Sequence, residues 1–228
     1  METGNVGTSK FQFSGVRIEN LGATEYTLVT IAVDVTGSTE RFADELRKCL
    51  IIAVESCQKS PRNLNLLLRV VLFSTSLQGG IEELHGFKPL GEINPNDYPT
   101  FRPHGATNLF DAALSAVGAT NAYGKKLMDQ EFLANGIVFV ITDGANNAST
   151  YTATNVREEM RRGVQGETIE SLIGILIGVN VHEFGPELKQ FEKDTDMKFI
   201  DAGDVSKGKL AKLAEFVSQS VSSQSQSL

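Results

Sequence analysis

Short, almost entirely apolar runs alternate with longer stretches of helical periodicity along most of the chain. The runs are rich in β-branched residues, as expected of strands that are covered on both faces. They lie at 25–33, 66–74, 136–142 and 171–179. Between them, apolar residues recur at helical spacing, for example at Phe42, Leu46 and Cys49. The pattern predicts helices at 39–58, 107–133, 154–162, 186–193 and 207–221, with Gly124 as a candidate break in the second.

Apolar strands that alternate with helices indicate a doubly wound α/β fold, in which a mostly parallel central sheet has helices on both faces. The turn residues Gln78-Gly79-Gly80 precede the run 81–87, which predicts one antiparallel strand at the edge of the sheet. A short last strand is predicted at 198–200. Ligands of such folds bind beyond the carboxyl ends of the strands. Functional residues are therefore expected just after Val33, Ser74, Thr142 and Val179.

The chain is expected to form one domain with a short segment at each end. Its 228 residues are 41% hydrophobic and 21% charged, which is enough apolar material for a sizeable core. In residues 1–24, Phe11 and Phe13 alternate with polar residues, which predicts a short edge strand or a loosely packed lead-in. The domain itself is expected at 25–221. The Ser/Gln-rich tail 222–228 is expected to be disordered.

Polar side chains follow the first predicted strand at alternating positions. Asp34, Thr36 and Ser38 come directly after its apolar residues. Alternate side chains of an extended or turning loop point the same way, so the three oxygens can converge. A carboxylate and two hydroxyls suit a hard cation such as Mg²⁺. A capped helix start is the simpler interpretation, but it explains only Ser38 and leaves the Asp unexplained.

Two further polar positions fall at the same predicted edge of the sheet. Thr107 opens a predicted helix two residues after Gly105, and Asp143 ends the strand 136–142 before Gly144. Each position alone is explained by a helix N-cap or by a turn. Their joint placement beside Asp34 instead favours a binding site, because this edge is where the architecture holds ligands.

Together these segments resemble the von Willebrand factor type A (vWA) domain family and its metal-ion-dependent adhesion site. The family pattern is Asp-x-Ser-x-Ser after the first strand, a Thr in a Gly-x-Thr loop, and Asp-Gly after a later strand. The order and spacing match over nearly the whole chain, with a Thr in place of the first Ser. The resemblance implies that Thr36, Ser38 and Thr107 ligate Mg²⁺ or Mn²⁺ through their hydroxyls. It implies that Asp34 and Asp143 act directly or through water.

The resemblance also implies a protein partner whose Asp or Glu completes the coordination of the metal, because hydroxyl ligands leave the cation electron-poor. Intracellular members of the family act as adaptors in multiprotein assemblies, some beside AAA+ ATPases or in stress and phage-related systems. We therefore expect a subunit of an intracellular system, bacterial or phage-related. In adhesive members the last helix moves on ligand binding, so 207–221 is expected either to switch or simply to fray.

Two segments that flank the metal ligands, 88–106 and 145–151, are expected to form a rim that contacts the partner. Exposed aromatic side chains at such a rim supply contact area at low entropic cost. The expected rim residues are Tyr98, Phe101, Arg102, His104, Asn146 and Tyr151.

Composition argues against several other classes of function. A net charge of −7 disfavours nucleic-acid binding, and no apolar run reaches the ~18 residues of a membrane span. No phosphate-binding loop, dinucleotide fingerprint or nucleophile elbow follows a strand. Cys49 and Cys57 lie on one predicted helix, roughly 12 Å apart by helical rise, which is too far for a disulfide. Reduced cysteines and the lack of a signal pattern predict a cytoplasmic protein.

The nearest enzyme alternative is an aspartyl phosphotransferase of the haloacid dehalogenase type, which also has an Asp at the end of its first strand. Its pattern is Asp-x-Asp-x-Thr, and the second Asp exchanges protons. Thr36 occupies that position here and cannot exchange protons near neutral pH. We therefore expect a binding domain rather than an enzyme.

Overall fold

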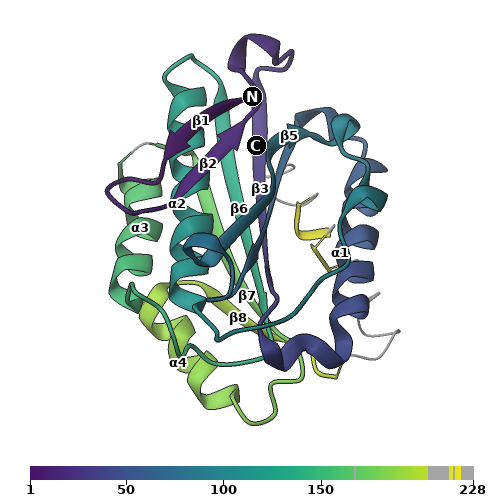
Figure 1. Ribbon diagram of the computed structural model, residues 1–228. Coiled ribbons are helices and arrows are strands. Elements are labelled where there is room, and N and C mark those ends of the chain that lie inside the picture. Colours follow the sequence, from purple (N-terminus) through teal and green to yellow (C-terminus); the bar gives the residue numbers. More distant parts are fainter. Residues whose placement is uncertain (167, 205–215, 218, 222–228) are drawn as a thin grey trace.

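The structure is a computed structural model that describes residues 1–166, 168–204, 216–217 and 219–221. In this part of the chain an eight-stranded, mostly parallel sheet has helices on both faces, which confirms the predicted fold class (Figure 1). The strands lie in the order β1-β2-β5-β4-β3-β6-β7-β8 across the sheet. Their bounds are β1 Glu2–Asn5, β2 Gln12–Gly15, β3 Glu25–Asp34, β4 Leu66–Phe73, β5 Ile81–Pro89, β6 Leu133–Thr142, β7 Ser171–Gly178 and β8 Lys198–Asp201.

Helix α1 covers one face of the sheet, and α2, α3 and α4 cover the other (Figure 1). None of the described helices is both long and apolar enough to cross a membrane. The α-helices are α1 Ala43–Gln58, α2 Leu109–Met128, α3 Ala153–Gln165 and α4 Gly185–Thr195. The 3₁₀ helices are η1 Ile18–Asn20, η2 Gly37–Phe42, η3 Asn63–Asn65, η4 Gln78–Gly80, η5 Leu90–Glu92 and η6 Pro95–Asp97.

Strand β3 lies at the centre of the sheet because its side chains are apolar toward both layers. Every residue of the strand after Glu25 is buried. Val29 and Ile31 belong to the core beneath α1, whereas Leu28 and Ala32 belong to the core beneath α2. A continuous apolar run is thus the sequence signature of a strand between two helical layers.

Two predicted helices differ from the observed ones. One differs in how it begins, and the other lacks the predicted break. The first predicted helix begins as the 3₁₀ helix η2 and becomes α-helical only at Ala43. Helix α2 runs unbroken through Gly124. A β-carbon at Gly124 would lie 3.1 Å from the carbonyl oxygen of Thr168 and 3.2 Å from Ile169. This glycine therefore serves close packing of α2 and does not end the helix.

The N-terminal segment is part of the central sheet. β1 and β2 pair antiparallel, and β2 continues the sheet alongside β5 through the pair Gly15 and Phe87. Phe11 and Phe13 are buried in the core beneath α2, which corresponds to the edge-strand alternative. β5 is antiparallel to β4 as predicted, but it is not the edge of the sheet, because β2 lies on its other side.

The C-terminal predictions fall mostly outside the described residues. These include most of the helix 207–221 and the whole tail 222–228. Val217 and Val221 are described, and both are buried in the core beneath α1. The apolar character predicted for these two positions therefore serves packing.

A buried ion pair joins the N-terminal hairpin to the rest of the sheet. The side chain of Arg69 on β4 is fully buried, and its Nε donates to Glu83 Oε2 on β5 at 2.6 Å. The same carboxylate accepts the N–H and the hydroxyl of Ser14 on β2, at 3.0 and 2.6 Å. Burial lowers the pKa of the Arg69 guanidinium, and the charge of Glu83 opposes that shift. Three neighbouring strands thus depend on one carboxylate.

We expect Glu83→Gln to lower the free energy of unfolding by about 3 to 5 kcal/mol, because it leaves a buried cation without its counter-charge. Urea unfolding followed by circular dichroism measures the change. The control is Glu82→Gln, an exposed residue on the same strand, which should change stability by less than about 0.5 kcal/mol. Equal effects of the two variants would show that the ion pair contributes nothing specific.

Candidate metal centre

The structure brings the five predicted metal ligands together at one edge of the sheet. Asp34 ends β3, and Asp143 follows the last residue of β6. The two strands are parallel neighbours, with Val33 opposite Ile141, so both carboxylates emerge at the same edge. Ser38 lies in η2, and Thr107 lies two residues before the start of α2.

Four side-chain oxygens form a continuous series across this edge. Ser38 Oγ donates to Asp143 Oδ1 at 2.8 Å, and it lies 3.1 Å from Thr36 Oγ1. Thr107 Oγ1 donates to Thr36 Oγ1 at 3.4 Å. Adjacent ligands of an octahedral Mg²⁺ with bonds of about 2.1 Å lie about 3.0 Å apart. The spacing of the four oxygens therefore fits a cation of that size.

Hydroxyl groups are indispensable to any such site. Among the described residues, no group of three or more His, Cys, Asp or Glu side chains is placed to hold a metal ion. Of the five predicted ligands only Asp34 and Asp143 are carboxylates, so the Thr and Ser oxygens have to supply the remaining ligands.

Asp34 is the most deeply buried of the predicted ligands, with none of its surface exposed. Its Oδ1 accepts the backbone N–H of Thr36 at 2.8 Å, and its Oδ2 accepts the hydroxyl of Thr142 at 2.6 Å. Burial raises the pKa of the carboxyl to about 6, against the opposing effect of these hydrogen bonds, and the charge of Asp143 raises it further. Asp34 thus orients Thr36 and holds the ends of β3 and β6 together.

Asp143 lies closer to the solvent. Burial also raises the pKa of its carboxyl, while the hydrogen bond from Ser38 and the charge of Arg41 lower it. Ser38 itself is exposed. Asp143 and Ser38 therefore form the open side of the oxygen series.

The loop before Thr107 is held against the first ligand loop by backbone contacts. Gly37 N–H donates to the carbonyl of Gly105 at 3.1 Å, and His104 N–H donates to the carbonyl of Val35 at 2.9 Å. Gly105 has a φ of +81°, and a β-carbon there would lie 2.8 Å from the backbone nitrogen of Ser76. Glycine is the residue that permits both this conformation and this approach.

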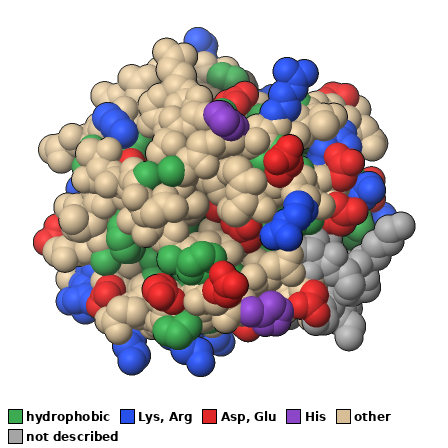
Figure 2. Space-filling model, turned by 60° about the horizontal axis from the view of Figure 1, so that its bottom comes forward, with side chains coloured by type: hydrophobic (Ala, Val, Ile, Leu, Met, Phe, Trp, Pro, Cys, Tyr) green, Lys and Arg blue, Asp and Glu red, His purple; other side chains and the backbone are tan. Residues whose placement is uncertain are grey.

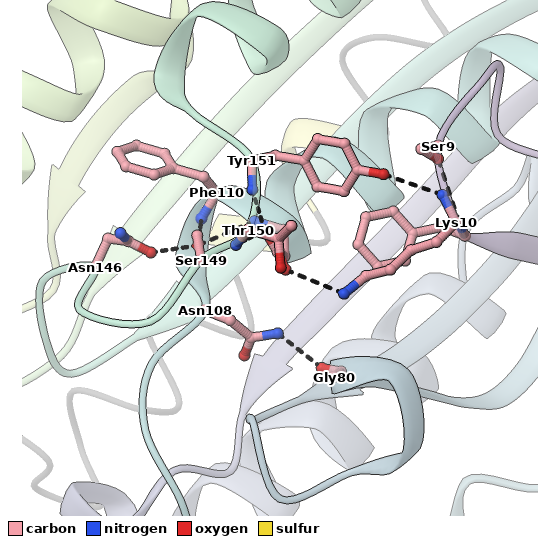
Figure 3. A network of polar contacts seen from close by, with 11 residues as sticks. Ser9, Lys10, Gly80, Asn108, Phe110, Asn146, Ser149, Thr150 and Tyr151 are labelled. Atoms are coloured by element: carbon pink, nitrogen blue, oxygen red, sulfur yellow. Dashed lines mark hydrogen bonds and ion pairs between the residues drawn. The ribbon is translucent and has the colours of Figure 1, made fainter.

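The loop after Asp143 fixes Thr107 from the other side. Asn147 Oδ1 accepts the N–H of Thr107 at 2.8 Å. The N–H groups of Asn147 and Ala148 donate to the Thr107 carbonyl at 3.0 and 3.1 Å. Ser149 Oγ accepts the N–H of Phe110 at 3.0 Å at the start of α2 (Figure 3). These hydrogen bonds fix the backbone of Thr107 and so determine where its hydroxyl lies.

Asp111, in the first turn of α2, connects this loop to the N-terminal hairpin. Its buried Oδ1 accepts the N–H groups of Thr150 and Tyr151 at 2.8 and 2.9 Å. Lys10 Nζ lies 3.7 Å from its Oδ2, and Lys10 N–H donates to the hydroxyl of Tyr151 at 3.1 Å. Asp111, Asn147 and Thr142 were not among the residues predicted to form the site. An acidic residue in a first helical turn was the one available signal, and it marked only Asp111.

The expectation of exposed aromatic residues in the loop 88–106 was wrong. Tyr98 and Phe101 are each only 5% exposed and belong to the core beneath α1. The ring of Tyr98 stacks on His85 at 5.7 Å, and its hydroxyl lies 2.9 Å from His85 Nε2. This loop closes the end of the α1 layer, so its apolar side chains pack inward.

The other expected rim residues lie near the site with different degrees of exposure. Arg102 and His104 are exposed and line a hollow of about 520 Å³ together with Arg41. Asn146 and Tyr151 are half-buried. Asn146 accepts a hydrogen bond from Ser149, and Tyr151 packs against Phe11. Both therefore hold the loop in place as well as border it.

A larger cleft of about 780 Å³ opens directly beside Ser38 and Asp143. It is also lined by Arg41 from η2 and by residues of the β7–α4 connection, among them His182 and Phe184. Figure 2 shows this end of the molecule, where acidic, basic and hydrophobic side chains lie interspersed. Functional residues were expected just after Val179, but none of the residues of this connection was named as part of the site.

No protein-family model matches the sequence, and no curated protein matches it. Solved structures do share its fold. The minor pilin PilB of Streptococcus sanguinis is 15% identical with a TM-score of 0.59, over 88% of this chain and 62% of that one. The pilus adhesin SpaC of Lactobacillus rhamnosus GG is 11% identical with a TM-score of 0.60, over 86% of this chain and 30% of that one.

A third structure is proximal thread matrix protein 1 (PTMP1) of the mussel byssus with a zinc-occupied MIDAS motif, the metal-ion-dependent adhesion site named above. It is 18% identical with a TM-score of 0.54, over 87% of this chain and 46% of that one. This chain therefore spans less than two thirds of each of the three proteins. At such identities the likeness shows a shared fold, that of adhesive, pilin and matrix proteins.

Proposed function

We propose that this vWA-like domain binds Mg²⁺ or Mn²⁺ at the ends of β3 and β6 and uses the cation to bind a protein partner through an acidic side chain. The observation that carries the proposal is the series of four oxygens spaced 2.8 to 3.4 Å apart. Thr36, Ser38, Thr107 and Asp143 would hold the metal. The buried carboxylate of Asp34 would orient the turn that carries Thr36 and Ser38, through its hydrogen bond from the Thr36 N–H. The bound cation would supply a positive charge that attracts a carboxylate.

The open side of the site supports a partner ligand. Ser38 is exposed and Asp143 faces the large cleft, so an incoming oxygen can approach from there. Asp143 would be the one carboxylate among the four oxygens that hold the metal, so a divalent cation there would keep a net positive charge that an anionic ligand can neutralise. The zinc-occupied MIDAS motif of PTMP1 lies on the same fold and supports the metal part of the proposal.

The environment of Asp34 supports binding over phosphoryl transfer. A phosphotransferase would use this carboxylate as its nucleophile. Here both of its oxygens accept hydrogen bonds from Thr36 and Thr142, and its surface is fully covered. A substrate phosphorus could not reach either oxygen without rearrangement of this turn.

The cellular setting follows from resemblance alone. We propose an adaptor role in a cytoplasmic multiprotein system, with an AAA+ ATPase assembly as the candidate context. These points stay predictions, because they depend on the identity of the partner.

The buried charge of Asp34 links metal binding to stability. Its pKa is about 6 in the folded protein and 3.8 when exposed, so the folded state holds the proton more tightly. In the absence of metal, folding therefore becomes less favourable as the pH rises from about 4 through 6. A cation beside the carboxylates would stabilise the charged form and remove this penalty.

We expect titration calorimetry to detect one Mg²⁺ or Mn²⁺ site in protein freed of EDTA. Thr36→Val removes the hydroxyl with little change of shape and should abolish binding, whereas Thr36→Ser retains the oxygen and should preserve it. Metal at ~100 times its dissociation constant should stabilise the wild type by about 2.7 kcal/mol. Absence of a melting shift with either metal, or full binding by Thr36→Val, would contradict the proposal.

We expect the metal-free wild type to lose about 2 kcal/mol of stability relative to Asp34→Asn as the pH rises from 4 to 7. The amide is neutral throughout and keeps groups able to bond Thr36 and Thr142. Urea unfolding of both proteins in EDTA across this range gives the difference. Saturating Mg²⁺ at pH 7 should stabilise only the wild type. A difference independent of pH would mean that Asp34 ionises freely.

A further inference from the structure

Arg41 lies beside the metal centre for a simple geometric reason. η2 is a 3₁₀ helix, in which side chains three positions apart lie one above the other. Arg41 follows Ser38 by three residues, and both side chains line the 780 Å³ cleft together with Asp143. The electrostatic effect of Arg41 on Asp143 agrees with this proximity.

The guanidinium of Arg41 is available to a ligand. It is exposed, and it forms no ion pair with any described residue. An arginine presents a planar fork of N–H groups that matches a carboxylate. Arg41 could therefore take one oxygen of a carboxylate whose other oxygen binds the metal.

Phe184 provides an apolar surface in the same cleft. It is 38% exposed, although most large hydrophobic side chains of the described chain are buried. A β-carbon at Gly144, the residue after Asp143, would lie 3.8 Å from its ring. The ring thus lies on the very turn that carries a predicted metal ligand.

We propose that the partner binds in this cleft as an extended protein segment with one acidic side chain, which reaches the metal and Arg41, and an adjacent apolar side chain, which packs on Phe184. The inference rests on the proposed metal site and names the partner chemistry that it selects. It moves the partner surface from the loop 88–106 to the space between η2 and the β7–α4 connection.

The charges around the cleft limit the partner further. Glu183 and Asp204 also line it, and Asp204 Oδ1 lies 2.8 Å from His182 Nε2. A run of acidic residues would meet these carboxylates and be repelled. The cleft therefore favours a single carboxylate flanked by apolar or neutral residues over a polyacidic segment.

The test uses a blocked tetrapeptide, acetyl-Gly-Glu-Leu-Gly-amide, with Mn²⁺ and the full chain. Broadening of the Glu γ-proton signals by Mn²⁺ reports peptide bound at the metal, and water-proton relaxation reports Mn²⁺ affinity. Arg41→Gln should weaken peptide binding by roughly fivefold or more. It should leave Mn²⁺ affinity unchanged or slightly higher, because a nearby positive charge is removed. Arg102→Gln, an exposed arginine outside the cleft, should change neither quantity.

Phe184→Ala separates the apolar contact from the ionic one. It should weaken binding of the Glu-Leu peptide but not of acetyl-Gly-Glu-Gly-Gly-amide. Equal effects of Arg41→Gln and Arg102→Gln, or equal effects of Phe184→Ala on both peptides, would overturn the inference. Mn²⁺ binding by the wild type without peptide broadening would overturn it while leaving the metal site intact. Lack of Mn²⁺ binding by the wild type would overturn the proposed function and this inference together.

Discussion

The candidate metal centre depends on one constraint, the burial of the Asp34 carboxylate at the end of the central strand. A buried carboxylate is unfavourable unless protein donors replace its hydrogen bonds to water. Asp34 accepts hydrogen bonds from the N–H of Thr36 and the hydroxyl of Thr142. The first bond shapes the turn that presents Thr36 and Ser38, and the second holds β6 in register beside β3. The same burial makes the charged form unfavourable, so the site is built around a group that a nearby cation would stabilise.

The remaining hydroxyl, that of Thr107, is positioned by contacts that are distant in sequence. The loop before it approaches the first ligand loop through Gly105, and the loop after Asp143 binds its backbone through Asn147. Asp111 extends this support to Lys10 in the N-terminal hairpin, and Glu83 attaches the hairpin to the sheet. A segment that looked like a lead-in therefore belongs to the scaffold of the site.

The sequence predicted those features that depend on local pattern. Continuous apolar runs identified the inner strands, and polar residues at strand ends identified Asp34 and Asp143, because parallel strands place their carboxyl ends at one edge. Features that depend on distant partners were not predictable. Tyr98 packs inward because α1 offers a covering surface, and Thr142 is 108 residues from the carboxylate that it bonds. The backbone register of β2 with β5 contains one residue pair, which leaves no periodic signal in the sequence.

The chain as a whole is negatively charged, whereas the site with a bound cation would be locally positive. This difference affects which partner can bind. The net charge of −7 repels an acidic partner, whereas a bound cation and Arg41 would attract a carboxylate in the cleft. At physiological ionic strength charges are screened beyond about 8 Å, so both the repulsion and the attraction act mainly once the partner is close to the surface. The cleft therefore discriminates between partners only when they are in contact with it. A neutral segment that carries one acidic side chain avoids most of the repulsion and still receives the full local attraction, and the exposed ring of Phe184 adds a contact that screening does not weaken.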